Sequence, residues 1–249
     1  MSPKAVTYSA RLGRIVRNET LSGLGTSTWI RIKEAIRESR VEDALDLVDY
    51  LLPEGKRLHD TMCDWVYSTL DFIARSSGEE SVYQAIRYAG ETIRRPYFHH
   101  VQGLAVEERV YLQAEGMRSH RSGPGELGNI EIVEEDERYV ISFDPCGSGG
   151  RMRRRGQLDG IPPRTGPPFN FGVTTRPYPW SWGKAGVPYY CLHCCIWSEI
   201  LPIEWSGYPV RITDYTEDPE KPCRFFFYKD PRLIPDHYFE RIGKKKPES

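Results

Sequence analysis

The stretch YYCLHCCIWSEIL, residues 189–201, carries three of the chain's six cysteines. We expect a helix over these residues. In a helix, Cys191, Cys194 and Cys195 share one face, because positions three and four apart are neighbours, whereas His193 points to a different side. Thiol and imidazole groups bind soft metals and carry out nucleophilic chemistry, so this helix is the first candidate for a functional site.

Outward from this helix, the sequence predicts an α+β fold. Helical periodicity upstream predicts helices over 28–40, 41–52, 58–74, 82–93 and 104–118, with Pro53-Glu54-Gly55 ending the second. Short β runs are expected over 129–133, 139–143, 208–215 and 224–228. The first two should form a hairpin that delivers Cys146 at its end, and the last two should pair. We therefore expect a helical region followed by a mixed or antiparallel sheet packed against the cysteine-bearing helix.

This pattern also suggests how the chain is organised. Residues 1–24 are expected to be a flexible N-terminal arm, 25–122 the helical region, 123–242 an α+β cysteine-rich region, and 243–249 a basic tail. The helical and cysteine-rich regions are expected to share one globular unit.

Composition limits the partners. The chain has 249 residues, enough for a sizeable core, and a formal net charge of -1, so no global field favours nucleic acid. Neither a signal peptide nor a run of ~20 apolar residues is evident, which predicts a cytoplasmic protein with no membrane partner and with reduced cysteines. A small-molecule substrate is the expected partner, and a homo-oligomer is compatible with the sequence.

The cysteine spacing predicts a metal site. Cys191 and Cys194 form a Cys-x-x-Cys pair that can chelate zinc, and tetrahedral zinc needs two further ligands. Cys146 and Cys223 are the candidates, and iron is the alternative metal. The competing interpretation is that these residues are small apolar core residues, and Cys195, beside Ile196 and Trp197, is the strongest case of it.

The run DPCGSGGR, residues 144–151, suggests a second kind of chemistry. Glycines that follow a strand can turn their N–H groups toward one point, which makes an anion-binding nest beside the Cys146 thiol. The predicted substrate-binding residues here are Gly147, Ser148, Gly149, Gly150 and Arg151. Four arginines in 151–155 should favour the thiolate of Cys146 and make it the most reactive thiol. The alternative is a glycine-rich turn beside a solvated basic face.

Proton transfer needs further candidates. His193 and Glu199 lie on the cysteine helix, and His120 ends the helix that leads toward Cys146. His59, four residues before Cys63, is a weaker candidate on a helix whose polar stripe is the alternative interpretation. In the loop 151–188, rich in Pro, Gly and aromatic residues, Trp180 and Trp182 are expected to close over the substrate.

Three stretches, FDPC (143–146), YCLHC (190–194) and ITD (212–214) through PCRFF (222–226), occur in an order that resembles the L-2-amino-thiazoline-4-carboxylic acid hydrolase-like family and the related 4-vinyl reductase domains. Hydrolase-like members also carry a helical N-terminal region. Sensor proteins with the 4-vinyl reductase domain hold a structural zinc, which implies Cys191, Asp214 and Cys223 as ligands, with Glu217 near the fourth position. One cysteine of that pattern is missing, whereas His193 and Cys194 are extra, so the resemblance implies the arrangement more than the activity.

We therefore predict a metal- or thiol-dependent hydrolase or lyase that acts on a small anionic aromatic or heterocyclic substrate. The alternative is a non-catalytic small-molecule-binding or sensor domain with a structural zinc. A third interpretation, nucleic-acid binding through 151–155 and the basic tail, is opposed by the neutral net charge.

Overall fold

The computed structural model describes residues 4–120, 130–154 and 160–248. The chain divides into two compact units, Met1–His59 and Asp60–Ser249, so the division falls inside one helix. Each unit is described by itself. No helix in the described part of the chain is both long and apolar enough to cross a membrane.

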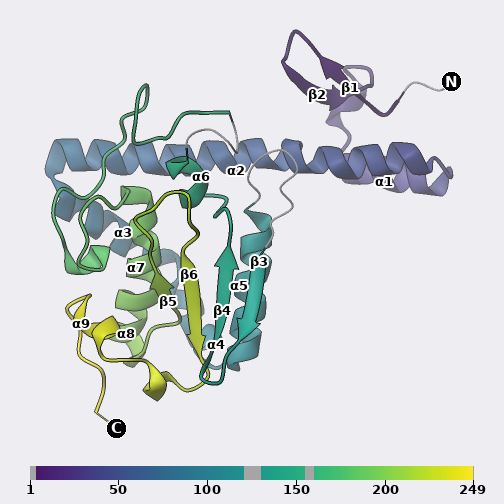
Figure 1. Cartoon of the computed structure of the whole chain (residues 1–249). Helices are drawn as coiled ribbons and strands as arrows, with labels where there is room; N and C mark the ends of the chain where they lie inside the picture. Colours follow the sequence, from purple (N-terminus) through teal and green to yellow (C-terminus); the bar gives the residue numbers. More distant parts are fainter. Residues whose placement is uncertain (1–3, 121–129, 155–159, 249) are drawn as a thin grey trace. The chain divides into compact units, whose positions relative to one another are not determined.

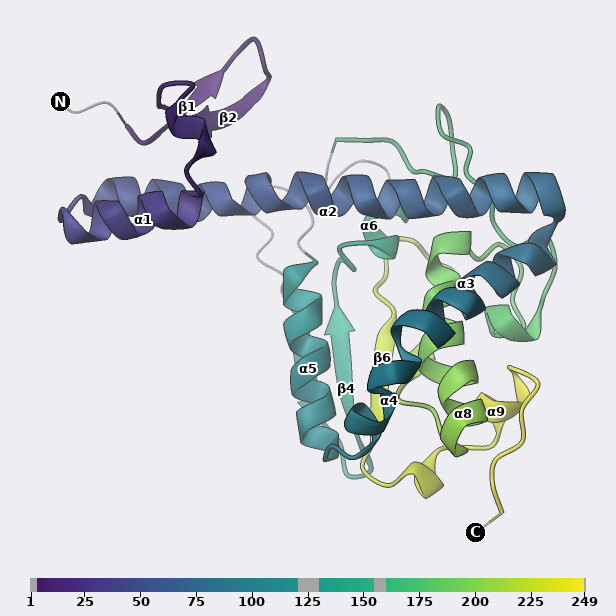
Figure 2. The same ribbon diagram turned by 180° about the vertical axis from the view of Figure 1, so that it is seen from behind.

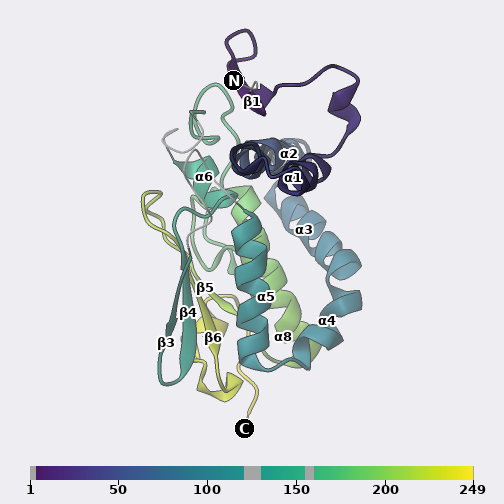
Figure 3. The ribbon, with the colours of Figure 1, turned by 90° about the vertical axis from the view of Figure 1, so that its right-hand side faces the viewer.

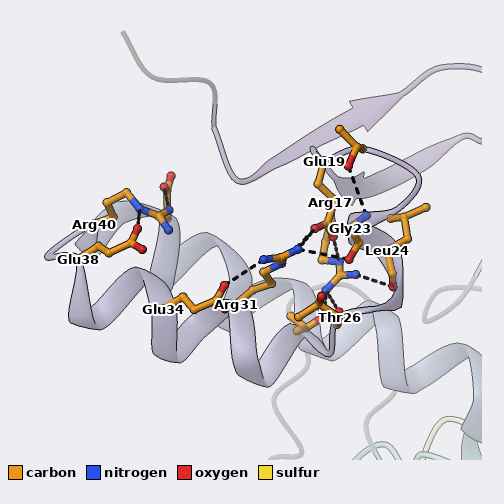
Figure 4. Close-up of polar contacts among 12 residues, drawn as sticks. Arg17, Glu19, Gly23, Leu24, Thr26, Arg31, Glu34, Glu38 and Arg40 are labelled. Carbon is orange, nitrogen blue, oxygen red and sulfur yellow. Dashed lines mark hydrogen bonds and ion pairs between the residues drawn. The ribbon is translucent and has the colours of Figure 1, made fainter.

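The first unit begins with a β-hairpin that the sequence analysis did not predict. β1 (Val6–Ser9) pairs antiparallel with β2 (Arg14–Arg17), inside the segment expected to be a flexible arm. Arg17 fixes the end of the hairpin: it forms an ion pair with Glu19 at 2.7 Å and donates to the carbonyls of Leu24 and Thr26 (Figure 4). Glu19 also binds Arg31 of α1, at 3.0 Å.

The helices of the first unit are α1 (Thr28–Arg37) and the beginning of α2 (Val41–Ser77), with a short 3-10 turn, η1 (Gly23–Gly25), before them. α2 runs through Pro53 without a break, so the prediction of two separate helices was wrong. A proline inside a helix removes one backbone hydrogen bond. Here the neighbouring Glu54 accepts a hydrogen bond from Thr28 at 2.9 Å, which ties this stretch of α2 to α1.

In the second unit, helices precede an antiparallel sheet, which confirms the predicted α+β class. After the end of α2 come α3 (Glu79–Ile93), α4 (Arg95–Gln102) and α5 (Val106–Ser119). The sheet has the order β3 (Ile130–Glu134), β4 (Arg138–Phe143), β6 (Arg224–Tyr228) and β5 (Ile212–Asp214), with every neighbouring pair antiparallel (Figure 1). Both predicted hairpin pairings, β3 with β4 and β5 with β6, are therefore confirmed.

The two faces of the sheet are buried against different elements, because side chains alternate along a strand. Ile141, Phe225 and Phe227 face α5, where they pack with Val110 and Met117. Figure 3 shows α5 and α8 (Leu201–Ser206) along this face and α3 and α4 farther from the sheet. The other face packs on the C-terminal segment, which contains η5 (Pro231–Leu233) and α9 (His237–Glu240), through Val140, Phe226 and Phe239.

The predicted cysteine helix is present and extends to Ser206. It is built from η3 (Tyr189–Cys191), α7 (Leu192–Cys195), the single π-helical turn η4 (Ile196–Ile200) and α8. Leu192, Ile196 and Leu201 are fully buried and pack with Val82 and Ile86 of α3, beside which this helix lies (Figure 2).

The loop before this helix is held in place by carboxylates of the preceding helices. Glu79 accepts hydrogen bonds from the Tyr178 and Tyr189 hydroxyls at 2.6 and 2.8 Å, and Asp71 accepts one from the Gly172 N–H at 2.8 Å. The loop contains the short turn η2 (Pro179–Ser181), and the short helix α6 (Gly149–Arg153) follows β4. The aromatic residues of the loop are therefore part of the packed structure.

Candidate functional site

The second unit contains a cavity of about 610 Å³, in the range of small-molecule sites. It lies between α4 and α5, the sheet, and the cysteine helix. Much of its wall is apolar and comes from Tyr97, Phe98, Val101, Leu112, Trp205, Phe225 and Phe227.

The cavity brings together most of the residues that the sequence suggested. The predicted residues in its wall are Cys146, Cys191, Cys194, Cys223, His120, His193, Ser148, Gly149, Gly150 and Trp182. The predicted residues that do not line it are His59, Gly147, Arg151, Trp180 and Glu199. The four cysteines therefore meet at one cavity, although they come from three segments of the chain.

The most reactive arrangement in the wall is centred on Cys194. His193 Nε2 lies 3.5 Å from Cys194 Sγ, and Arg211 Nη2 donates to the same sulfur at 3.5 Å. His193 Nδ1 lies 2.6 Å from the carbonyl oxygen of Tyr190, which can only accept, so Nδ1 carries a proton. This contact leaves Nε2 facing the thiol. A nucleophile, a base and a group that orients the base are thus assembled.

The sequence analysis predicted that His193 points to a different side of the helix from the cysteines. This prediction was wrong with respect to Cys194, which His193 contacts. Consecutive residues of a helix do point in different directions. The bond from His193 to the Tyr190 carbonyl, one turn earlier, turns the imidazole so that its far nitrogen reaches the neighbouring sulfur.

Electrostatics make Cys194 a thiolate near neutral pH. Burial alone would raise the pKa of Cys194, but the charges of His193 and Arg211 and their hydrogen bonds outweigh it and lower the pKa to about 6. Burial would likewise lower the pKa of His193, yet the Cys194 thiolate and the Tyr190 carbonyl raise it above its ordinary value. The two residues therefore form a thiolate–imidazolium pair.

Proline chemistry explains how Arg211 reaches this sulfur. Pro202 has no N–H to donate to the carbonyl of Ser198, four residues earlier. The Ser198 carbonyl instead accepts from the Val210 N–H at 3.0 Å, which ties the segment before β5 to the cysteine helix. The next residue, Arg211, is buried, with its guanidinium over the Phe225 ring and bonded to Thr213 Oγ1 at 3.1 Å.

Apart from the Cys194–His193 pair, the charged residues of the cavity wall are all basic in the part of the chain that the structure describes. They are Arg94, Arg109, Arg153, Arg154, Arg211 and Lys221, and no Asp or Glu lines the cavity alongside them. Low-dielectric walls with one sign of charge concentrate ligands of the opposite sign. The cavity is therefore suited to an anionic ligand.

Two of these arginines form no ion pair among the described residues. Among the described residues, neither Arg94 nor Arg109 forms an ion pair or a side-chain hydrogen bond, and Arg109 Nε is buried without any partner. Burial lowers the pKa of both. The nearby charge of Arg211 lowers the pKa of Arg94 further and that of Cys194 opposes it, whereas at Arg109 the charge of Glu107 opposes burial. Arg94 lies over the Trp197 ring at 5.3 Å. A buried donor without a partner, such as Arg109 Nε, marks a place where a ligand completes the hydrogen bonding.

The structure gives Arg151 a different role from the predicted one. Its guanidinium is fully buried and forms ion pairs with Asp60 at 3.2 Å and Asp64 at 3.5 Å, so its charge is already balanced. Arg153 donates to the backbone carbonyls of Thr216 and Glu217, and Arg154 binds Asp144. Arg155 lies outside the described residues. The expectation that these arginines hold the anion therefore does not apply to Arg151.

The glycine run beside Cys146 allows close packing. A Cβ on Gly147 would lie 1.7 Å from the carbonyl oxygen of His120, and one on Gly149 would lie 2.7 Å from Cys191 Sγ. Glycine is needed at both positions because no side chain fits. Cys146 Sγ lies 3.6 Å from Ser148 Oγ. The prediction that Cys146 is the most reactive thiol is not tested by these contacts. The cationic groups that favour a thiolate, His193 and Arg211, lie beside Cys194 instead.

Glu199 is a structural residue in this arrangement. It is fully buried, accepts hydrogen bonds from Trp182 Nε1 at 2.9 Å and the Thr213 N–H at 2.8 Å, and forms an ion pair with Arg241 at 2.8 Å. Burial raises its pKa, opposed by Arg241 and these hydrogen bonds. Trp182 adopts a left-handed backbone conformation, φ 54°, and stacks on Tyr215. Glu199 therefore positions the wall and does not face the cavity.

The four thiols are a donor set that zinc would accept, but their arrangement does not fit the ion. In the described residues, no three Cys, His, Asp or Glu side chains are placed to hold a metal together. Burial raises the pKa of Cys191 well above that of an ordinary thiol and that of Cys223 to about 11, so both are protonated. Asp214 and Glu217, implied as ligands by the resemblance, bind Arg224 and Lys184. Zinc binding stays a prediction.

Sequence reasoning missed three residues of this site: Arg94, Arg109 and Arg211. They belong to three different segments, and only the fold brings them to one cavity. Comparison of the chain with models of protein families, with curated proteins and with solved structures found no match. The resemblance drawn from the cysteine pattern stays a prediction.

Proposed function

We propose that the chain is a thiol-dependent hydrolase or lyase that acts on a small anionic molecule with an aromatic or heterocyclic body, and that Cys194 is its nucleophile. The observation that carries the proposal is the contact of Cys194 Sγ with both His193 and Arg211 inside the cavity. A lowered thiol pKa beside a base is the usual way to activate a cysteine nucleophile.

The cationic wall supports an anionic substrate. Arg94 and Arg211 are close enough for each charge to influence the other, and Arg94 also interacts with the charge of Cys194. With the imidazolium of His193, three positive groups interact with one thiolate, which leaves an excess of positive charge. A carboxylate or similar anion bound there neutralises it and lies close to the nucleophile.

The apolar wall supports the rest of the substrate. Aromatic side chains from α4, the sheet and the cysteine helix give the cavity flat surfaces on which a ring can stack. Trp182 and Tyr215 form one such stacked pair, with ring centroids 5.0 Å apart. The apolar surroundings also strengthen the electrostatic interactions around the sulfur.

The chemistry follows from the protonation states. The Cys194 thiolate adds to an electrophilic carbon of the substrate, and the His193 imidazolium gives its proton to the leaving nitrogen or oxygen as that bond breaks. In the hydrolytic course, the neutral imidazole then removes a proton from water, which attacks the carbon bound to Cys194 Sγ. The C–S bond breaks and the thiolate is restored, with its imidazolium partner.

A pair of alkylating reagents that differ in charge tests the proposal. Iodoacetate is anionic and iodoacetamide neutral, and a thiolate free in solution repels iodoacetate. At Cys194 we expect iodoacetate to react faster than iodoacetamide, by roughly tenfold at low salt. The preference for iodoacetate should be smaller at high salt, where the charges are screened. Arg94→Gln should remove most of this preference. Arg95→Gln, whose guanidinium is exposed and pairs with Glu91, is the matched control and should keep it.

The opposite order of rates at Cys194, unchanged by Arg94→Gln, would contradict an anion-binding site at this thiol. Labelling of the separated peptides assigns each rate to a particular cysteine.

A second function is favoured by one observation. Arg109 Nε is buried without a hydrogen-bond partner, and no hydrogen bond joins Arg109 to Cys194 among the described residues, so an anion bound at Arg109 need not react. A non-catalytic binding or sensor domain would use the same cavity. Such a domain would bind an anion at Arg109 and leave it unchanged, whereas an enzyme would convert the bound anion into a product.

A further inference from the structure

Cys191 and Cys194 are close enough in the fold to be joined. They are three residues apart, and both have helical backbone conformation, with Cys191 at the end of η3 and Cys194 in α7. Helix geometry places the Cα atoms of such residues about 5 Å apart. A disulfide needs Cα atoms roughly 4.4–6.8 Å apart, so the backbone already satisfies this condition.

The surroundings of the two sulfurs differ. Cys194 Sγ contacts His193 and Arg211, two cationic partners that stabilise the thiolate. Cys191 Sγ packs against Gly149, where a Cβ would come within 2.7 Å, and so lies beside backbone. Cys194 is thus the sulfur prepared to attack, and Cys191 is the neighbouring thiol on the same helical segment. Both line the cavity, through which a small molecule reaches them.

We propose that Cys191 and Cys194 form a dithiol that small-molecule disulfides oxidise reversibly to an intramolecular disulfide. This inference rests on the proposed function in one respect, since both use Cys194 as the nucleophile. Formation of the bond consumes that nucleophile, so it would switch off the proposed activity.

The exchange proceeds in two steps. The Cys194 thiolate attacks one sulfur of the small disulfide, the S–S bond breaks, and the departing thiolate takes the proton of His193. Cys191 then loses its proton to the neutral imidazole and attacks Cys194 Sγ, which expels the second small thiolate. Two protein thiols are oxidised by two electrons, and one disulfide is reduced to two thiols. Excess small thiol reverses both steps.

Cys146 and Cys223 line the same cavity and are the alternative partners for Cys194. Each comes from a separate segment of the chain, near the end of β4 and before β6, so either bond would depend on the placement of two elements. Cys191 belongs to the same helical segment as Cys194 and needs no such movement. This is the reason to choose Cys191.

The experiment uses the full chain, reduced and then equilibrated with mixtures of oxidised and reduced glutathione. Acid quenching, alkylation of the remaining thiols and peptide mass spectrometry identify each product. We expect a Cys191–Cys194 bond in wild-type protein, seen as the loss of two hydrogens from the peptide. Cys191→Ser should stop at a stable glutathione adduct on Cys194, whereas Cys223→Ser should behave as wild type. Cys191→Ala and the unfolding curve of each variant control for misfolding.

A lasting glutathione adduct on wild-type Cys194, or a bond from Cys194 to Cys146 or Cys223, would overturn the assignment of Cys191. Rapid alkylation of Cys194 without any disulfide would remove this inference and leave the proposed function intact. A Cys194 that reacts with neither alkylating agent nor disulfide would remove both.

Discussion

Replacing His193 by Gln should raise the pKa of Cys194. In the wild-type protein the charge of His193 is the first of the influences that lower this pKa to about 6, against burial, which raises it. Glutamine keeps a polar side chain of similar size but carries no charge. With burial and Arg211 then opposing each other, we expect the pKa to return close to the ~8.5 of a free cysteine.

The difference in rate is largest below neutral pH. At pH 6 about half of wild-type Cys194 is ionised, whereas a pKa of ~8.5 leaves about 0.3% thiolate, a ratio of about 160. Nucleophilicity rises with pKa, with a Brønsted slope of about 0.45, and recovers about 13-fold of that loss. We therefore expect alkylation at pH 6 to be slower by about tenfold in the variant. At pH 8.5 the order should reverse, with the variant faster by about sevenfold, because half of its Cys194 is then ionised and its thiolate is the stronger nucleophile.

The assay is the pH dependence of iodoacetamide labelling at the Cys194 peptide. The wild-type midpoint should lie near 6, and the His193→Gln midpoint should be about 2.5 units higher. His120→Gln, which changes another histidine of the same cavity wall, is the control and should leave the midpoint where it is. A wild-type midpoint at or above that of free cysteine would refute the thiolate–imidazolium pair. So would one that His193→Gln leaves unchanged.

Three further changes test other parts of the site. Arg109→Met removes a buried donor that has no partner, so urea unfolding should show the ligand-free protein stabilised by about 1 kcal/mol. The control Arg118→Met, at an exposed position of the same helix, should change the stability little. Destabilisation by Arg109→Met would contradict an unsatisfied Arg109. Gly149→Ala should destabilise the protein by about 1–3 kcal/mol, since the new Cβ would meet Cys191 Sγ. Gly116→Ala, at a glycine with open space around it, should not destabilise the protein. Equal effects of the two changes would argue against the close contact at Gly149. Dialysed protein tests the zinc predicted from the cysteine spacing: because no three side chains of the described residues are placed to hold the ion together, we expect no bound equivalent, and one equivalent that the double variant Cys191→Ser, Cys194→Ser lacks would contradict this.

The fold was largely predictable because it depends on periodic patterns. The hairpin of β3 and β4, the strand β6 and the start of the cysteine helix all lie within a residue of their expected positions. The break expected at Pro53 was wrong, since the loss of one backbone hydrogen bond does not end a helix whose neighbouring turns are intact. The hairpin of β1 and β2 was missed because its short strands lie among polar residues.

The candidate site was predictable only in part. Spacing alone placed Cys191 and Cys194 together, and the strand ends placed Cys146 and Cys223 near them. Which thiol is activated depends on Arg211, whose position follows from the bond between the Val210 N–H and the Ser198 carbonyl. Likewise, Arg151 looked like an anion-binding residue until the fold placed it between two aspartates of α2. Such long-range pairings leave no local signal in the sequence.

The central claim is that Cys194, and not Cys146, is the nucleophile of this cavity. Competitive labelling of the native chain at pH 6 with a limiting amount of iodoacetamide tests it most directly, with all six cysteines quantified by peptide mass spectrometry. We expect Cys194 to be labelled first and buried Cys195 to be labelled last, since burial raises its pKa well above the ordinary value. Labelling of Cys146 as fast as or faster than Cys194 would contradict the claim.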